Sequence, residues 1–277
     1  MNAQKATTGQ NFRCGFYEVS PRRRMAAIKK AGFDETMFWW GDEFEQTDGT
    51  RFELFDLAAE LGLGVNTCHF PSTNADDLWY GGERGKKYVE HFAAACKECG
   101  ERGIRNLVLH LTRKTVTPEP NGYGVVNFAE MLEAAQQNNV VIAIENTRFL
   151  RYNDFILEKF PSRPNIGFCY DSGHHNAYTP NEQPLDKYGS MLVTTHIHDN
   201  EGPSGTPQDQ HHIMGEGNIN YDAVFEKLKR YNVPRLNLES YCNETSIYFN
   251  KISVEEFLEK SYRRLTEQMR KSGIKFR

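Results

Sequence analysis

The stretch 140-VVIAIENTRFLRYNDFILEKFPSRPNIGFCYDSG-173 contains one full repeat of the pattern that decides the fold. A short apolar run rich in β-branched residues (140–146) precedes a segment of helical periodicity (151–160), and a second apolar run (166–173) follows. A strand, a helix and a second strand in this order predict a parallel βαβ unit. An acidic residue, Glu145 or Asp171, stands near the end of each apolar run.

The same alternation continues along the rest of the chain. Further strands are predicted at 12–18, 35–40, 65–71, 106–111, 192–200 and 235–241, each leading into a segment of helical period. Strands that alternate with helices predict a parallel sheet, and eight such units predict an α/β protein with a single (β/α)8 TIM barrel. An open doubly wound sheet is the alternative, but no Gly-rich dinucleotide turn follows the first run.

The domain organisation follows from the absence of any linker or shift in composition. We predict one TIM-barrel domain over 1–277, in which the polar residues 1–11 form a disordered or extended N-terminal tail. Cys96 and Cys99 form a C-x-x-C in a helical segment without a second cysteine pair, so we predict a plain helical pair rather than a redox or metal site.

Composition and charge argue against nucleic acid and membranes as partners. The net charge of −4 gives no general footprint for a polyanion, which argues against nucleic acid. The N-terminal residues lack an apolar signal core, and no apolar run approaches the roughly 20 residues that a membrane helix needs. We therefore expect a cytoplasmic protein without membrane contact.

Titratable residues stand at the ends of the predicted strands. In a barrel the active site lies at the carboxyl ends of the strands. The third to eighth predicted strands carry there, in order, His69, His110, Glu145, Asp171, His196 and Glu239. A single residue of this kind often caps a helix, and Asp171 could do so alone. Six on consecutive strands instead indicate a divalent metal site, because a metal compensates clustered carboxylates and fixes imidazole tautomers.

Other polar residues near these strand ends have simpler interpretations. His175, His198 and His212 each neighbour a better placed histidine, and we expect them to point into the wall or to solvent. Glu216 lies between two glycines and is interpreted as a turn residue.

Aromatic residues are expected at the mouth of the barrel. Trp39, Trp79 and Tyr80 are predicted to form a wall that stacks on the apolar face of a sugar, with packing at the top of the barrel as the alternative for Trp39. Trp79 and Tyr80 precede two glycines in a long segment, which suggests a mobile lid.

The motifs at the strand ends carry a family resemblance. The sequence resembles the xylose-isomerase-like TIM barrel superfamily, which includes sugar phosphate isomerases and epimerases, inosose dehydratases and the endonuclease IV group. The resemblance rests on IENT (144–147), DSGH (171–174), HIHDN (196–200), DQHHIMGEGNI (209–219) and LES (238–240). It implies a divalent metal held by Glu145, Asp171, His196 and Glu239. It also implies that Glu145 and Glu239 are the catalytic pair that removes and returns a proton.

The function implied by this resemblance is a divalent-metal-dependent isomerase or epimerase for a sugar or sugar phosphate. Proton transfer would proceed through a metal-stabilised cis-enediolate, with a small-molecule sugar as partner. The mixed His and carboxylate set suits Mn²⁺, Zn²⁺ or Co²⁺ better than Mg²⁺, and one ion is expected. A homo-oligomer is expected by the same analogy.

Two alternatives stay open on the same scaffold. Endonuclease IV members bind three zinc ions, and the sequence fills the additional positions with His69, His110, His174, Asp209 and His211. These five residues would otherwise bind substrate. An abasic-site phosphodiesterase with up to three metals is therefore one alternative, although the first predicted strand lacks the Gly-Ala-His type of opening associated with the nucleases. A cyclitol or keto-sugar dehydratase or lyase is the other.

Overall fold

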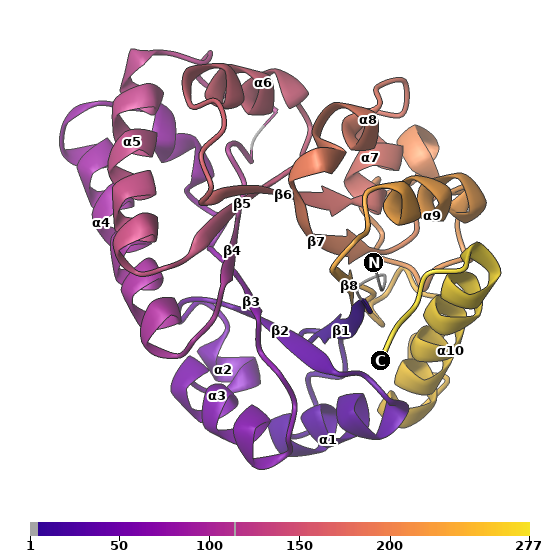
Figure 1. Cartoon of the computed structure of the whole chain (residues 1–277). Coiled ribbons are helices and arrows are strands. Elements are labelled where there is room, and N and C mark those ends of the chain that lie inside the picture. The colour runs from indigo at the N-terminus through magenta and orange to yellow at the C-terminus, as the bar shows by residue number, and fades with distance from the viewer. Residues whose placement is uncertain (1–4, 114) are drawn as a thin grey trace.

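The computed structural model of the chain describes residues 5–113 and 115–277. Its eight parallel strands form one closed barrel in the order β1 to β8, and the helices surround it (Figure 1). The (β/α)8 TIM barrel predicted from the sequence is confirmed. The strands are β1 (Thr7–Asn11), β2 (Glu35–Trp39), β3 (Thr67–His69), β4 (Asn106–Leu109), β5 (Val141–Glu145), β6 (Ile166–Asp171), β7 (Leu192–Ile197) and β8 (Arg235–Leu238).

The helices cover the outside of the barrel. They are α1 (Pro21–Ala31), α2 (Glu45–Asp48), α3 (Arg51–Glu60), α4 (Gly82–Glu101), α5 (Gly122–Gln137), α6 (Leu150–Lys159), α7 (Ser172–Tyr178), α8 (Pro184–Tyr188), α9 (Tyr221–Arg230) and α10 (Val254–Ser272). Short 3-10 turns lie at η1 (Ala75–Trp79), η2 (Gly189–Met191) and η3 (Gly202–Ser204). Cys96 and Cys99 lie in α4 as buried free thiols, in agreement with the predicted helical pair. Within the described ranges, no helix is both long and apolar enough to cross a membrane.

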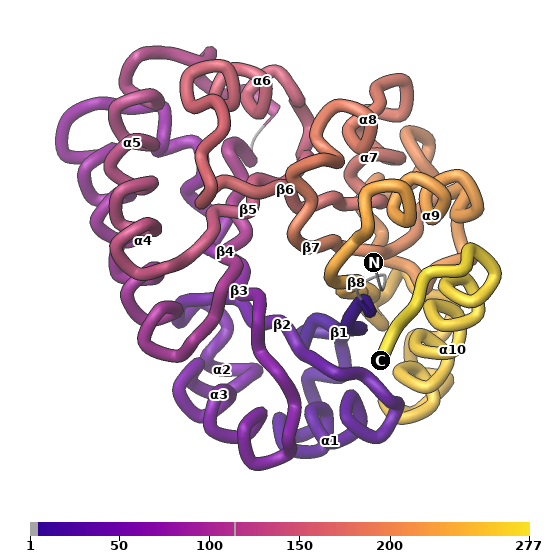
Figure 2. Tube along the Cα trace, in the orientation of Figure 1, coloured from indigo at the N-terminus to yellow at the C-terminus, as the bar shows by residue number. Residues whose placement is uncertain are grey.

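The first strand is the main correction to the sequence-based prediction. Residues 7–11 are not part of a tail, because they form β1, which pairs with β2 on one edge and β8 on the other. The predicted strand at 12–18 is wrong, since the chain leaves the barrel there with a positive φ at Gly15 and Phe16. Residues 1–4 of the predicted tail lie outside the described residues. The C-terminal segment returns to this place (Figure 2), and the backbone carbonyl oxygen of Lys275 accepts a hydrogen bond from the amide of Ala6.

The inner face of the barrel changes from apolar to polar toward the carboxyl ends of the strands. Val108, Ala143 and Cys169 form a small buried apolar cluster separate from the main core. Side chains two residues apart on a strand share a face, so Ala143 lies below Glu145 and Cys169 below Asp171. A small apolar layer therefore supports a polar layer at the carboxyl ends of the strands.

Candidate active site

The carboxyl ends of the strands bring the predicted residues together. His69, Glu145 and Asp171 are the last residues of β3, β5 and β6, whereas His110 and Glu239 directly follow β4 and β8. Glu145, Asp171, His196 and Glu239 are all buried, and each can offer one ligand atom so that the four atoms lie within 4.8 Å of one another. Asp171 also caps the start of α7, because its Oδ1 accepts a hydrogen bond from the amide of His174.

The Nδ1 atom of His196 marks the centre of this group. It lies 3.1 Å from Glu145 Oε1, 3.5 Å from Glu239 Oε2 and 3.8 Å from Asp171 Oδ2. In the part of the chain that the structure describes, neither Lys nor Arg pairs with these three carboxylates, and the ion pairs that they form are all to histidine. Three buried carboxylates beside one imidazole are a donor set that fits a divalent cation of the Mn²⁺, Zn²⁺ or Co²⁺ type.

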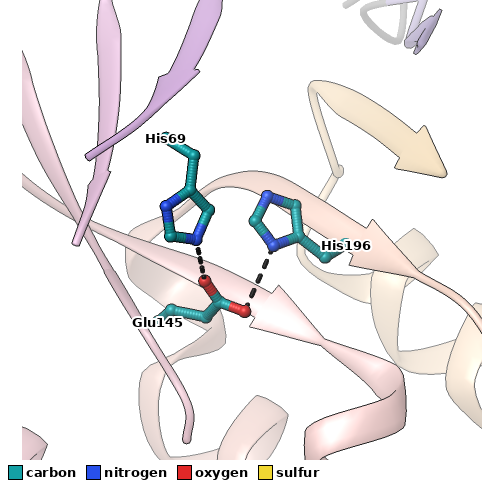
Figure 3. A group of neighbouring side chains, drawn as sticks. All are labelled: His69, Glu145 and His196. Carbon is teal, nitrogen blue, oxygen red and sulfur yellow. Dashed lines mark hydrogen bonds and ion pairs between the residues drawn. The ribbon is translucent and has the colours of Figure 1, made fainter. Parts of the chain in front are cut away.

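Glu145 is enclosed by four imidazole rings, which we call the imidazole collar: His69, His110, His174 and His196. Its Oε1 lies 3.1 Å from Nδ1 of both His174 and His196. Its Oε2 lies 3.0 Å from His110 Nε2 and 3.3 Å from His69 Nε2. Figure 3 shows Glu145 between His69 and His196, with one carboxylate oxygen directed to each ring. Burial alone would raise the pKa of Glu145, but the imidazoles of His196 and His110 outweigh it and hold the pKa well below its usual value.

Glu239 has different neighbours. The side-chain amide of Asn11 donates a hydrogen bond of 2.9 Å to Oε1, and the hydroxyl of Tyr241 donates one of 3.2 Å to the same atom. The Oε2 atom is directed toward His196. The sequence pattern does not single out Asn11, because this residue falls in the predicted tail and its partner is far away in the chain.

A third group lies beside the first two. Asp209 lies 3.4 Å from His174 Nε2 through Oδ2 and 3.4 Å from His211 Nε2 through Oδ1. Burial opposes ionisation of Asp209, yet the imidazoles of His211 and His174 hold its pKa well below the usual value. Burial would lower the pKa of His211, but Asp209 outweighs it and raises that pKa to about 9.

His198 corrects another prediction. It points neither into the wall nor to solvent, because its fully buried Nε2 lies 3.2 Å from Asp171 and 3.8 Å from Asp209. The ring occupies the space left by Gly173, where an added Cβ would lie 1.9 Å from His198 Cε1. The sequence does contain a signal for this position, since residues 196 and 198 are two apart and two-residue spacing places strand side chains on one face.

The other simple interpretations are confirmed. The ring of His175 is hydrogen-bonded to the Tyr170 hydroxyl through Nδ1 and to the Glu182 carbonyl oxygen through Nε2. His212 Nε2 lies 3.1 Å from the Thr245 carbonyl oxygen. Neither ring is among the metal-ligand groups found in the described residues. Glu216 lies in the bend between the glycines and accepts a hydrogen bond from the Tyr248 hydroxyl.

A cavity of about 380 Å³ opens above these residues. His69, His110, His174, Asp209, His211 and Glu239 line it, whereas Glu145, Asp171 and His196 lie beneath that lining. Trp39 is part of the wall and stacks on His69 with a centroid distance of 4.0 Å. Tyr178 and Tyr241 complete the aromatic wall, and the sequence pattern singles out neither of them.

Trp79 and Tyr80 do not belong to this wall. Trp79 is 1% exposed, and its indole N–H donates to the carbonyl of Leu111 within the core. The prediction of a substrate wall or mobile lid is therefore wrong for Trp79. Tyr80 is partly exposed beneath the guanidinium of Arg84, outside the cavity lining.

Comparison with known proteins assigns the chain to a family. Uncharacterized protein y4fM of Sinorhizobium fredii is 24% identical over 289 residues, covering 85% of this chain and 87% of that protein. Probable endonuclease 4 of Mesoplasma florum is 23% identical over 194 residues, covering 63% of this chain and 66% of that protein. The solved structure of an L-ribulose 3-epimerase shares the fold, with a TM-score of 0.74, 17% identity and coverage of 97% and 96% of the two chains. A family model described as a xylose isomerase-like TIM barrel matches residues 25–269, and the chain therefore belongs to that family.

Proposed function

We propose that the protein is a divalent-metal-dependent isomerase or epimerase acting on a sugar or sugar phosphate. The observation that carries this proposal is the convergence of three carboxylates and one imidazole at the base of a cavity, with one carboxylate, Glu239, open to that cavity. The shared fold with an L-ribulose 3-epimerase supports the reaction class.

The metal would be held by Glu145, Asp171, His196 and Glu239. When bound, it would act as a Lewis acid that increases the acidity of the C–H beside a sugar carbonyl and stabilises the resulting enediolate charge. The set suits Mn²⁺, Zn²⁺ or Co²⁺, because each accepts mixed nitrogen and oxygen ligands.

The two glutamates are the proposed proton carriers. Asn11 and Tyr241 fix the orientation of Glu239 through Oε1, with Oε2 toward the proposed metal centre, and this carboxylate would take a proton from a substrate carbon. We assign the first proton removal to Glu239, since it lines the cavity and Glu145 does not. The proton would return to the other face or to the neighbouring carbon either from Glu239 itself or from Glu145 on β5, which must first take up a proton from solvent because its pKa is low. Carboxylates are adequate bases here only if the metal acidifies the substrate and the cavity restricts water.

A second candidate function rests on a specific observation. His69 and His110 reach Glu145, and His174, Asp209 and His211 form a further group beside it. If these groups also hold ions, the site would suit activation of water for phosphodiester hydrolysis. The partial similarity to a probable endonuclease 4 supports this candidate.

Metal content and proton exchange separate the two candidates. The metal per chain is measured by plasma mass spectrometry on untagged protein never exposed to chelator. The expected result is about one ion per chain and deuterium exchange from solvent into ketoses, which Glu239→Gln and Glu145→Gln strongly slow. About three zinc ions together with nicking of abasic duplex DNA and no exchange would replace the isomerase with the phosphodiesterase. Loss of water or another leaving group, seen in the product mass, would indicate the dehydratase or lyase.

A further inference from the structure

Two arginines stand on one side of the cavity rim. Arg113 follows β4 and Arg148 follows β5, and these two strands are neighbours in the barrel. Both side chains line the cavity. Among residues 5–113 and 115–277, neither guanidinium has a carboxylate partner within ion-pair distance; their side-chain contacts are to a hydroxyl and an aromatic ring. Arg151, one turn further on, differs because it pairs with Glu119 at 3.3 Å and does not line the cavity.

The position of Arg148 is fixed by neutral groups. Its guanidinium stacks over the ring of Tyr178 at 3.8 Å and donates to the Tyr178 hydroxyl at 2.9 Å. Arg113 is held in a similar way by a 3.0 Å hydrogen bond to the hydroxyl of Thr73. A guanidinium has five N–H donors, so most donors of both residues stay free for a ligand. Such an arrangement orients the charge without neutralising it.

Charge is divided between the two ends of the cavity. The base carries the carboxylates, which are matched by the imidazole collar and by His211. The rim carries the two arginines on the β4 and β5 side, and Ser72, Thr112 and Thr147 also line the cavity. The guanidinium groups do not serve to neutralise the carboxylates at the base, because those carboxylates contact histidines. A rim of cationic and hydroxyl donors suits a phosphate or carboxylate, which guanidinium binds through paired hydrogen bonds.

We propose that the substrate carries an anionic group, a phosphate or a carboxylate, at the end remote from the reacting carbon, and that Arg148 with Arg113 binds it. This inference rests on the proposed function, since it assigns the base of the cavity to the reacting end of the same molecule. Arg148 is expected to contribute more to anion binding than Arg113, because Arg148 is half-buried and stacked on Tyr178, whereas Arg113 is exposed.

The test compares three linear five-carbon probes that cannot react. Xylitol, xylitol 5-phosphate and xylonate are titrated by calorimetry into the metal-loaded full-length protein. At least one anionic probe is expected to bind roughly tenfold tighter or more than xylitol. The tighter of the two anionic probes identifies phosphate or carboxylate as the natural group. In Arg148→Met the anionic probe is expected to bind no more tightly than xylitol binds to the same variant, and Arg113→Met is expected to reduce the preference in part.

Matched variants separate charge recognition from loss of structure. Arg151→Met is the control, since it removes an arginine close by in the chain that is paired and outside the cavity. Arg148→Lys keeps the charge and retains part of the preference, which a purely structural role through Tyr178 would not predict. Each variant is checked by circular dichroism and its melting temperature.

Three results would overturn the inference: equal binding of all three probes, a preference that persists in Arg148→Met, or no detectable binding of either anionic probe. In the second case the metal, rather than the rim, would attract the anion. The inference and the proposed function fail separately. Deuterium exchange into ketoses, together with equal binding of all three probes, would preserve the isomerase and reject the anion site. An anion preference that depends on Arg148, with no exchange in any sugar, would reject the isomerase alone.

Discussion

The regions around Glu145 and Glu239 hold a carboxylate in opposite ways. Glu145 lies beneath the cavity lining, and both of its oxygens contact imidazoles. Glu239 lines the cavity, and a side-chain amide and a phenol hold one of its oxygens. Imidazoles are groups that can share a metal with the carboxylate, whereas Asn11 and Tyr241 only orient it. Under the proposed function, this difference would make Glu145 mainly a metal ligand at the centre of the site and Glu239 the carboxylate that faces the substrate.

Replacement of each glutamate by glutamine is the strongest test of this contrast. Both Glu145→Gln and Glu239→Gln are expected to lower the rate of proton exchange by about 10²- to 10⁴-fold, the usual contribution of a general acid or base. The metal content should differ, because Glu145→Gln removes a charge shared by four imidazoles. We expect a larger loss of metal in Glu145→Gln than in Glu239→Gln, measured on protein purified in parallel.

Glu216→Gln is the matched control for these variants, because Glu216 is a bend glutamate bonded to Tyr248 and outside the metal group. Equal loss of metal in the two active-site variants would contradict the contrast and make the glutamates equivalent ligands.

Removal of the groups that hold Glu239 tests the other half of the comparison. Asn11→Ala and Tyr241→Phe each delete one hydrogen bond to Glu239 Oε1. Partners that orient a ligand in this way typically contribute roughly 10- to 100-fold in activity or metal affinity. We expect kcat to fall within about that range while KM changes little, since the carboxylate loses its orientation but not its charge. A change confined to KM would place both residues in substrate binding.

The pH dependence of metal affinity should also differ between the two regions. On the Glu145 side, burial lowers the pKa of His110, so this ring is uncharged at neutral pH. On the Glu239 side, Asp209 overcomes burial and raises the pKa of His211 to about 9, so this ring is protonated in the metal-free protein at neutral pH. Burial would lower the pKa of the proposed ligand His196, but Cys169 and Glu145 outweigh it and raise that pKa well above its usual value, so a metal must displace a proton there in every variant. If His211 is a further ligand, displacement of its proton adds about tenfold in affinity per pH unit up to about pH 9.

Competition against a zinc-chelating dye across roughly pH 6–9 measures this slope. His211→Gln should lower the slope, and His110→Gln should leave it unchanged. An identical slope in the two variants would show that His211 is not a ligand and that the single-ion arrangement holds.

The order of strands, helices and strand-end residues could be predicted from the sequence alone. Local periodicity identifies seven of the eight strands in place, because apolar β-branched runs and helical spacing are properties of neighbouring residues. The alternation then requires the strand ends to face one mouth, so the sequence itself places Glu145, Asp171, His196 and Glu239 together.

The tertiary structure alone decided the features that depend on distant partners. The strand TTGQN (7–11) has no apolar run, and it is stable because β2 and β8 bond both of its edges. Trp79 belongs to the core because the Leu111 carbonyl accepts its indole N–H. Asn11 reaches Glu239 across 228 positions of sequence. Buried polar groups must find hydrogen-bond partners, and local sequence does not show which distant residue will supply them.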